Sequence, residues 1–198
     1  MIKHARPDHP VHELIARRWS PSAFAERDVP REDLLSLLEA VRWAASSYNE
    51  QPWGLLVAAR GEGQEFERLL SCLVPANQEW ARRASVLILT TIRRQFSHNG
   101  KPNRVAEHDL GLAMGNLCLE ATHRGISVHQ MAGVDLDKAR EEYKIPPGID
   151  PYTAVALGYP ADPEDASVPE ELRARDGKPR TRKPLAEFVF AGEFGKAW

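Results

Sequence analysis

The sequence predicts a single domain, residues 1–198, that combines α-helices with short β-strands. A chain of 198 residues is long enough to bury roughly 70% of its unfolded surface around one core. Residues 85–92 (Ser-Val-Leu-Ile-Leu-Thr-Thr-Ile) are apolar and β-branched nearly throughout, which is typical of a central strand. Residues 103–124 repeat apolar side chains at helical spacing on two faces, which predicts a long helix buried on more than one side.

The remaining elements are expected to alternate along the chain. Pro30, followed by Glu32 and Asp33, predicts a helix start, because proline suits the first turn and acids favour the positive end of a helix dipole. This helix must end before Pro52. The other expected elements are a strand at 54–59, helical segments at 62–73 and 77–83, a polar loop at 93–102, a strand at 126–131, a short helix from 135 and a strand at 152–158.

Two features of the pattern point beyond one chain. In the helix expected at 103–124, Gly111 and Gly115 would let another backbone approach closely. That approach fits either a helix contact inside the fold or a subunit interface, and we favour a dimer because so small a domain rarely encloses a helix completely. The last forty residues are rich in proline and charge and carry few apolar side chains. They are therefore expected to lie on another surface, such as that of a partner subunit.

Composition argues against several classes of protein. The 26 basic and 28 acidic residues nearly balance, so neither nucleic acid nor an anionic membrane is an expected partner. The longest apolar run is far shorter than the ~18 residues of a membrane span, and residues 1–10 lack the apolar stretch of a signal peptide. Cys72 and Cys118 are expected to be buried thiols in a reducing compartment. A soluble, cytoplasmic protein follows as the expectation.

Several familiar catalytic sites are not expected. The sequence has no GxGxxG after a strand, no P-loop and no G-x-S-x-G motif. The histidines near the start lack the carboxylate–histidine spacing of a metal site, so no metal is expected. His108 and Asp109 allow either a catalytic pair or a structural hydrogen bond, and we favour the second. His123 and His129 are expected to be satisfied core or edge histidines.

Three polar segments suggest a binding site for a phosphate-bearing heterocycle. Residues 17–24 read Arg-Arg-Trp-Ser-Pro-Ser-Ala-Phe, and paired guanidinium groups beside a hydroxyl can chelate a phosphate. Residues 44–53 read Ala-Ala-Ser-Ser-Tyr-Asn-Glu-Gln-Pro-Trp and offer neutral donors and acceptors that suit a ring edge or a sugar chain. Six basic residues and one acid lie in 173–183. Each segment taken alone also fits a helix end, a polar turn or a solvated loop.

Together, and in this order, the first two segments resemble the motifs of the FMN-dependent nitroreductase family, the NAD(P)H-dependent flavin oxidoreductases. The segments 77–80, 125–135, 154–160 and 180–185 extend the resemblance over nearly the whole chain. The resemblance implies an α+β fold with a central, mostly antiparallel sheet flanked by helices. It also implies an intertwined homodimer with an extended C-terminal segment and one FMN at each of two interface clefts.

The resemblance further implies a role for individual residues. Arg18, Arg180 and Arg182 would bind the FMN phosphate, and the backbone N–H of Ala132 would donate to flavin N5. Ser46, Ser47 and Asn49 would reach over from the other subunit. The complete expected set of cofactor-binding residues is Arg18, Trp19, Ser20, Ser22, Ser46, Ser47, Asn49, Asn77, Gln130, Met131, Ala132, Gly133, Arg180 and Arg182.

The chain departs from the family pattern at three positions. Ala45 stands where most members have proline, and Trp80 stands where many have a basic residue. Ser22 stands where most relatives place a cation near flavin N1 and O2. Because a serine cannot supply a full charge, reduced FMN is expected to be less favoured here, and Ser22→Arg is expected to raise the two-electron potential.

The implied activity is a ping-pong oxidoreduction in which NADH or NADPH reduces FMN at N5 and a small electron acceptor then takes the electrons. The acceptor would be a nitroaromatic, a quinone or an unsaturated carbonyl, and no side chain is expected to act as a catalytic nucleophile. The loop 93–103, with Phe96, is expected to shape the acceptor pocket. The alternative is an FMN-binding storage or sensor protein without efficient NAD(P)H turnover. A flavin-destroying or dehalogenating relative is less favoured, because no long lid insertion is present.

Overall fold

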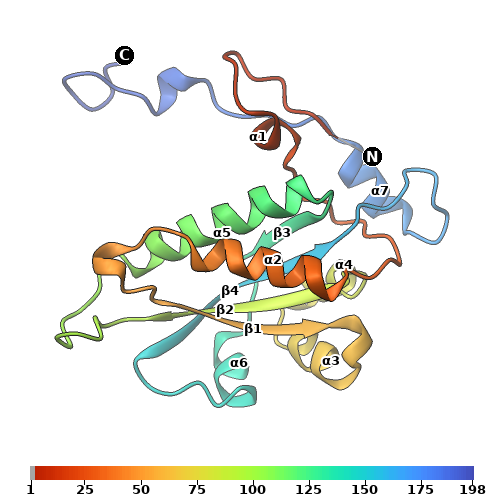
Figure 1. Cartoon of the computed structure of the whole chain (residues 1–198). Helices are drawn as coiled ribbons and strands as arrows, with labels where there is room; N and C mark the ends of the chain where they lie inside the picture. Colours follow the sequence, from red (N-terminus) through yellow and green to blue (C-terminus); the bar gives the residue numbers. More distant parts are fainter. Residues whose placement is uncertain (1–2) are drawn as a thin grey trace.

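A computed structural model of the chain describes residues 3–198, with a four-stranded sheet at their centre. The strands are β1 (Trp53–Ala59), β2 (Val86–Arg93), β3 (Ser127–Met131) and β4 (Ile149–Gly158). They lie in the order β1-β2-β4-β3, and each neighbouring pair is antiparallel. Helices lie on both sides of the sheet (Figure 1). The α+β class and the antiparallel sheet expected from the sequence are confirmed.

Strand β2 is central, as its apolar sequence predicts, because it pairs with β1 on one side and β4 on the other. Successive side chains of a strand point to opposite faces. Val86 and Ile88 accordingly belong to the core on one face, and Leu87 and Leu89 belong to the core on the other. A strand covered on both faces needs apolar residues at every position, which is what this segment supplies.

Two layers of helices cover the sheet. One face is covered by α2 (Arg31–Arg42) and α5 (Ala106–His123), and the other by α3 (Gln64–Ser71), α4 (Pro75–Ala81) and α6 (Leu136–Glu142). The elements outside these layers are α1 (Glu13–Arg17), α7 (Glu170–Gly177) and the 3₁₀ turns η1 (Ser47–Asn49), η2 (Arg60–Glu62) and η3 (Leu185–Glu187). Within residues 3–198, every helix is too short or too polar to cross a membrane.

Helix α5 buries two of its sides and leaves a third open. Leu110 and Leu117 are buried in the core, whereas Leu112 and Leu119 are 42% and 36% exposed. A Cβ added at Gly111 or Gly115 would meet no described atom within 4 Å. The close helix contact that these glycines allow is therefore not made inside the chain, and a small apolar face of α5 remains uncovered.

Strand β4 begins earlier than the sequence predicts, because it runs through Pro151. A proline cannot donate to a sheet ladder, and it is tolerated at bulges and where one side of the strand is unpaired. Both conditions hold here. The register with β2 shifts between Leu89 and Thr91, which is opposite Pro151, and β3 pairs only with residues 154–158 of β4.

The C-terminal segment divides into two parts. Its first part lies on its own chain, because Ala161 and Val168 pack in a small cluster with Ala23. The expectation that the last forty residues lie on another surface holds for this part, and that surface belongs to the same chain and not to a partner subunit. The last part, residues 184–198, extends away from the body of the molecule (Figure 1), and Phe194 and Trp198 are 95% and 90% exposed.

Candidate functional site

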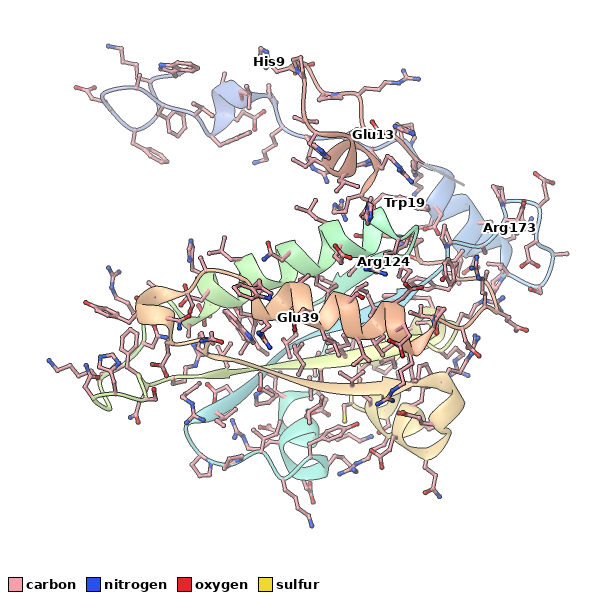
Figure 2. All side chains as sticks on the ribbon, viewed as in Figure 1. His9, Glu13, Trp19, Glu39, Arg124 and Arg173 are labelled. Carbon is pink, nitrogen blue, oxygen red and sulfur yellow. The ribbon has the colours of Figure 1, made fainter. Side chains whose placement is uncertain are left out.

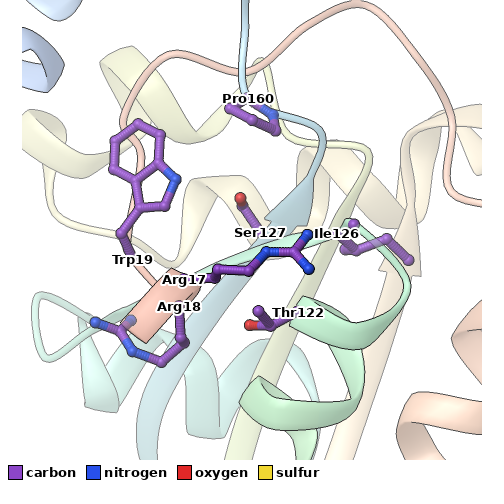
Figure 3. Close-up of a pocket in the computed structure, with 8 residues that line it drawn as sticks. Arg17, Arg18, Trp19, Thr122, Ile126, Ser127 and Pro160 are labelled. Carbon is purple, nitrogen blue, oxygen red and sulfur yellow. The ribbon is translucent and has the colours of Figure 1, made fainter. Parts of the chain in front are cut away.

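The paired arginines lie at the end of α1, where the helix stops and the chain becomes extended. The N–H of Arg18 closes the last turn on the Leu14 carbonyl. The side chains of Arg17 and Arg18 then diverge (Figure 3). Arg17 extends along Ser127 into a small cavity of about 60 Å³, and Arg18 turns the other way. Only Arg18 of the two reaches the larger cavity described next.

A larger cavity of about 270 Å³ lies between the N-terminal segment and the C-terminal segment. We call it the basic basin, because most of its polar lining is cationic. Trp19, which lies between α1 and the body of the molecule, forms part of its wall (Figure 2). The lining residues are Lys3, Arg18, Trp19, Ser20, His129, Arg175, Asp176, Lys178, Pro179, Arg180 and Arg182. The fold thus brings to one cavity the three arginines that the resemblance assigns to the FMN phosphate, together with two further residues of the expected cofactor-binding set, Trp19 and Ser20.

The arginines of the basin crowd one another. Burial lowers the pKa of Arg180, and the like charges of Arg18 and Arg182 lower it further. Within residues 3–198, none of the three guanidinium groups lies within 4 Å of a carboxylate. Arg180 is held in place by neutral carbonyls, because its Nη1 donates to Lys3 O at 2.7 Å and to Ala16 O at 2.6 Å. Such a cluster favours binding of a multiply charged anion.

The end of β3 forms the second part of the candidate site. Because β3 is an edge strand, one side of its backbone is unpaired. Ala132, the first residue after the strand, is exposed, and no acceptor among the described residues takes its N–H. The Met131 side chain is buried in the core, and Gln130 donates from Nε2 to Cys118 Sγ at 3.4 Å. A ligand lying here would therefore meet the backbone of Met131 and not its side chain, whereas Gln130 is exposed.

Asn77 and Gly133 are held against each other beside this strand end. Asn77, in the first turn of α4, donates from Nδ2 to Gly133 O at 3.1 Å. A Cβ at Gly133 would lie 2.5 Å from that Nδ2 and 2.7 Å from Val74 Cγ2, closer than real contacts allow. Glycine is therefore required at this position for steric reasons, and the two predicted site residues are brought together.

The second sequence motif lies at the opposite end of α5. Ser47 begins η1 and donates its backbone N–H to Asp109 Oδ2 at 3.0 Å, near the start of α5. The end of α1, which supplies Arg18 to the basic basin, lies near the other end of this helix (Figure 1), and Thr122 of α5 lines the small cavity beside Arg17 and Arg18. Eighteen residues of α-helix span roughly 27 Å. One chain therefore does not bring Ser46, Ser47 and Asn49 to the basin.

A short aromatic cluster accompanies this motif. Tyr48 has a positive φ of 54° and is 82% exposed, and its ring meets the ring of Phe96 edge to face at 5.7 Å. The loop that carries Phe96 is fixed to the turn by Glu50, whose carboxylate accepts from Ser97 N at 2.8 Å and from Ser97 Oγ at 3.1 Å. The loop expected to shape an acceptor pocket is thus attached to the second motif.

Ser22 belongs to the first motif, but unlike Arg18, Trp19 and Ser20 it does not line the basic basin. Its side chain is 1% exposed, and its Oγ has no hydrogen-bond partner among the described residues. Its backbone N–H instead donates to the carboxylate of Asp176 at 2.9 Å. In this arrangement the Ser22 hydroxyl does not face the space in which a ligand would lie.

Comparison with known proteins places this geometry in a family. The model of the nitroreductase family matches residues 15–76 and 63–159, which together cover most of the chain. The chain belongs to the nitroreductase family. The match includes both sequence motifs, the central strand and the end of β3, so the resemblance inferred from the residues is confirmed.

Two curated relatives of this nitroreductase-family protein are informative. It is 25% identical over 211 residues to the major NAD(P)H-flavin oxidoreductase of Aliivibrio fischeri, a match that covers 84% of this chain and 95% of the relative. It is also 33% identical over 129 residues to an uncharacterized 15.4 kDa protein of Mycolicibacterium smegmatis, covering 64% of this chain and 82% of the relative.

Solved structures agree with the fold. A crystal structure described as an oxidoreductase containing FMN superposes with a TM-score of 0.89 at 34% identity, over 96% of each chain. A putative nitroreductase from Desulfovibrio desulfuricans, solved in complex with FMN, superposes with a TM-score of 0.70 at 24% identity, over 95% of this chain and 99% of that one. The second likeness supports the fold alone.

Some residues that line the basic basin were not predicted as ligand-binding. Lys3, His129 and Asp176 all line the basic basin. The sequence gives a weak signal for Asp176, because it is the one acid within the basic cluster 173–183. No sequence signal marks Lys3, since only the fold brings the N-terminal segment to the C-terminal one. Ala45, where most members have proline, is exposed in the second motif.

Proposed function

We propose that this protein is an FMN-dependent oxidoreductase that takes electrons from NADH or NADPH and passes them to a small electron acceptor. The observation that carries the proposal is the convergence of Arg18, Arg180 and Arg182, none of them paired with a carboxylate in residues 3–198, in a cavity that His129 of the edge strand β3 also lines. Membership of the nitroreductase family and the flavin-linked names of the relatives support the same cofactor.

The basic basin fits the phosphate end of FMN. A phosphate monoester carries nearly two negative charges at pH 7, and guanidinium forks match its oxygens. Arg180 uses only Nη1 for its bonds to the backbone, so Nε and Nη2 remain for a ligand. The Ser20 hydroxyl accepts from Arg18 Nη1 at 3.1 Å and can donate its own proton to a phosphate oxygen. A bound dianion would also relieve the repulsion that lowers the pKa of Arg180.

The open end of β3 fits the flavin ring. A flat heterocycle can lie against an edge strand and take hydrogen bonds from its unpaired backbone. The N–H of Ala132, which no described residue accepts, is the donor that we assign to N5, and Asn77 would meet the polar edge of the ring. Gln130, Met131 and Gly133 would line one face, chiefly through their backbone.

A second copy of the chain completes the site in this proposal. The uncovered face of α5, with Leu112 and Leu119 exposed and no described atom near a Cβ at Gly115, fits a helix from a partner. A dimer built there would carry Ser46, Ser47 and Asn49 of each chain toward the basin of the other, and residues 184–198 would lie along the partner. Support comes from the separation of the two half-sites within one chain.

When bound, FMN supplies two-electron chemistry, accepting hydride from NAD(P)H and delivering it to a nitroaromatic, a quinone or a related electrophile. The residues of the chain would hold and orient the flavin and exclude water from it. The Ala132 N–H would keep a hydrogen bond at N5, and the Tyr48–Phe96 pair would exclude water from the open face that donor and acceptor occupy in turn. Cys72 and Cys118 are buried free thiols, which supports the cytoplasm as the compartment.

The test is the optical spectrum of the purified protein. We expect the yellow spectrum of an oxidised flavin with about one FMN per chain, and bleaching when NADH or NADPH is added without oxygen. Reoxidation by a quinone or a nitroaromatic should then restore the spectrum. Yellow protein that neither nicotinamide bleaches would point to storage or sensing of FMN. Protein that stays colourless and takes up no added FMN would refute the proposal.

A further inference from the structure

The carboxylate of Asp176 joins the two segments that form the basic basin. Asp176 lies near the end of α7, and its oxygens accept the backbone N–H of Ser22 at 2.9 Å and of Ala23 at 2.8 Å. Ser22 and Ala23 are 1% and 4% exposed, so water cannot replace these bonds. Two successive backbone N–H groups around one carboxylate form a compact anion-binding arrangement.

The same region is fastened at a second point. Lys3 donates from Nζ to the backbone oxygen of Asp176, and Arg180 donates from Nη1 to the carbonyls of Lys3 and Ala16. We call residues 176–182 the strap. Its two fastenings fix where Arg180 and Arg182 lie relative to Arg18, which stands at the end of the short helix α1.

Asp176 is negatively charged, so it is not expected to contact a phosphate directly. A carboxylate in a phosphate site repels the phosphate unless its charge is already engaged. Here three hydrogen bonds from backbone N–H groups engage it. The carboxylate can therefore stabilise the strap without contacting the ligand, and its neighbours Arg175 and Lys178 add to the positive lining.

We propose that Asp176 is the positioning residue of the phosphate subsite: its bonds to the Ser22 and Ala23 N–H groups hold the strap so that Arg18, Arg180 and Arg182 converge on one dianion. The inference rests on the proposed function. It assigns Asp176 to recognition of the phosphate and not to recognition of the flavin ring, which lies toward β3. The first motif thereby gains a second role. Its backbone N–H groups at Ser22 and Ala23 bind Asp176 and so hold the strap in place.

The experiment compares FMN with riboflavin, which lacks the phosphate. Apoprotein of wild type, Asp176→Asn and Asp176→Ala is titrated with each flavin, and circular dichroism confirms that each variant is folded. Loss of aligned charge-assisted contacts should weaken FMN binding by roughly tenfold or more, while riboflavin binding changes little. Glu171→Ala is the matched control, because Glu171 is an exposed acid on the same helix.

Each outcome decides the matter. A drop in the preference for FMN over riboflavin in the Asp176 variants, with the control unchanged, supports the positioning role. Unchanged or tighter FMN binding overturns it, and tighter binding would mean that Asp176 acts mainly as a repulsive charge. An equal loss for both flavins also overturns it, since a general structural defect does not distinguish them. If Asp176→Ala does not fold, the nearly isosteric Asp176→Asn decides.

Failure of the proposed function has a different signature. In that case the wild-type protein itself would bind neither flavin, or would bind FMN and riboflavin equally, and the assignment of Asp176 to a phosphate would fall with it. If wild type prefers FMN and the Asp176 variants keep that preference, the proposed function stands and the inference alone is wrong.

Discussion

The indole of Trp80 stacks on the imidazole of His129, with ring centroids 4.3 Å apart and planes inclined by 29°. Phe24 stacks on Trp80 in turn, at 6.4 Å. His129 Nδ1 lies 2.8 Å from the carbonyl oxygen of Pro21, and because a carbonyl only accepts, Nδ1 must carry a proton. In the neutral ring, Nε2 is then unprotonated and can accept a hydrogen bond. His129 also lines the basic basin. The stack thus connects α4, β3 and the first motif beside the candidate site.

The first prediction concerns pH. Burial lowers the pKa of His129, with further lowering by Arg175 and Arg18, while the Pro21 carbonyl and Asp176 act in the opposite direction. Because the folded pKa lies below the unfolded value of about 6.5, the unfolded chain binds more protons between the two values, and stability falls as pH drops through that window. We expect wild type to unfold at a higher temperature than His129→Gln at about pH 8. This difference in thermal midpoint should shrink as the pH is lowered to about 5.5. An advantage that is constant or grows on acidification would show that His129 is not held neutral by the fold.

The second prediction concerns the phosphate site. Arg182→Ala and the double variant Arg180→Ala/Arg182→Ala should lose FMN, because each charge-assisted contact contributes roughly 1.5–3 kcal/mol, so the pair should weaken binding by at least about tenfold. Arg182 is the cleaner single change, since its one hydrogen bond in the described structure is to the neighbouring Thr181 carbonyl. Flavin content after purification and FMN titration measure the effect. Arg31→Ala, an exposed arginine on α2, serves as control, and full FMN occupancy in the double variant would contradict the assignment.

The third prediction concerns assembly. Because a Cβ at Gly115 meets no described atom within 4 Å, Gly115→Leu should leave the single chain able to fold. The larger side chain should nevertheless block a partner helix, so light scattering is expected to give a dimer for wild type and a monomer without flavin for the variant. Gly61→Leu, equally free of contacts but remote from α5, should stay dimeric. A yellow monomer, of wild type or variant, would contradict the shared site.

The fourth prediction concerns Gly133. In Gly133→Ala the new Cβ would clash with Asn77 Nδ2 and Val74 Cγ2, so the start of α4 must shift. We expect a loss of stability of about 1–3 kcal/mol, as for other overpacked sites, together with weaker FMN binding. Chemical unfolding and FMN titration measure the two effects, and Gly61→Ala is the control without contacts. Unchanged unfolding would show that the strand end and α4 are not tightly coupled.

Periodicity predicted most of the fold, because the core is built from side chains that alternate or recur along each element. The apolar run 85–92 became the central strand β2, and the doubly apolar segment 103–124 became α5. The start of β4 was missed because Pro151 argues against a strand, and only the tertiary arrangement reveals that its neighbour is absent there.

The candidate site was predictable in composition and less so in geometry. Arg18, Arg180 and Arg182 were assigned to the FMN phosphate from motifs far apart in sequence, and the fold brings them to one cavity. Ser22 shows what a local sequence pattern does not predict. The pattern indicated a residue beside the flavin, but its side chain is buried and its N–H is bound by Asp176, a long-range contact that no local pattern encodes. Ser22→Arg would therefore force a long charged side chain into a closed space, and it is a poor test of flavin potential in this chain.

The length of α5 has a consequence for how the protein would behave on dilution. If each site combines the basin of one chain with the Ser46–Asn49 turn of another, binding of FMN and association of chains are thermodynamically linked. Excess FMN would then hold chains together at concentrations where the apoprotein dissociates, and the apparent affinity for FMN would rise with protein concentration. Cofactor supply would in that way set the assembly state, and a cell short of flavin would contain separated chains with half-sites.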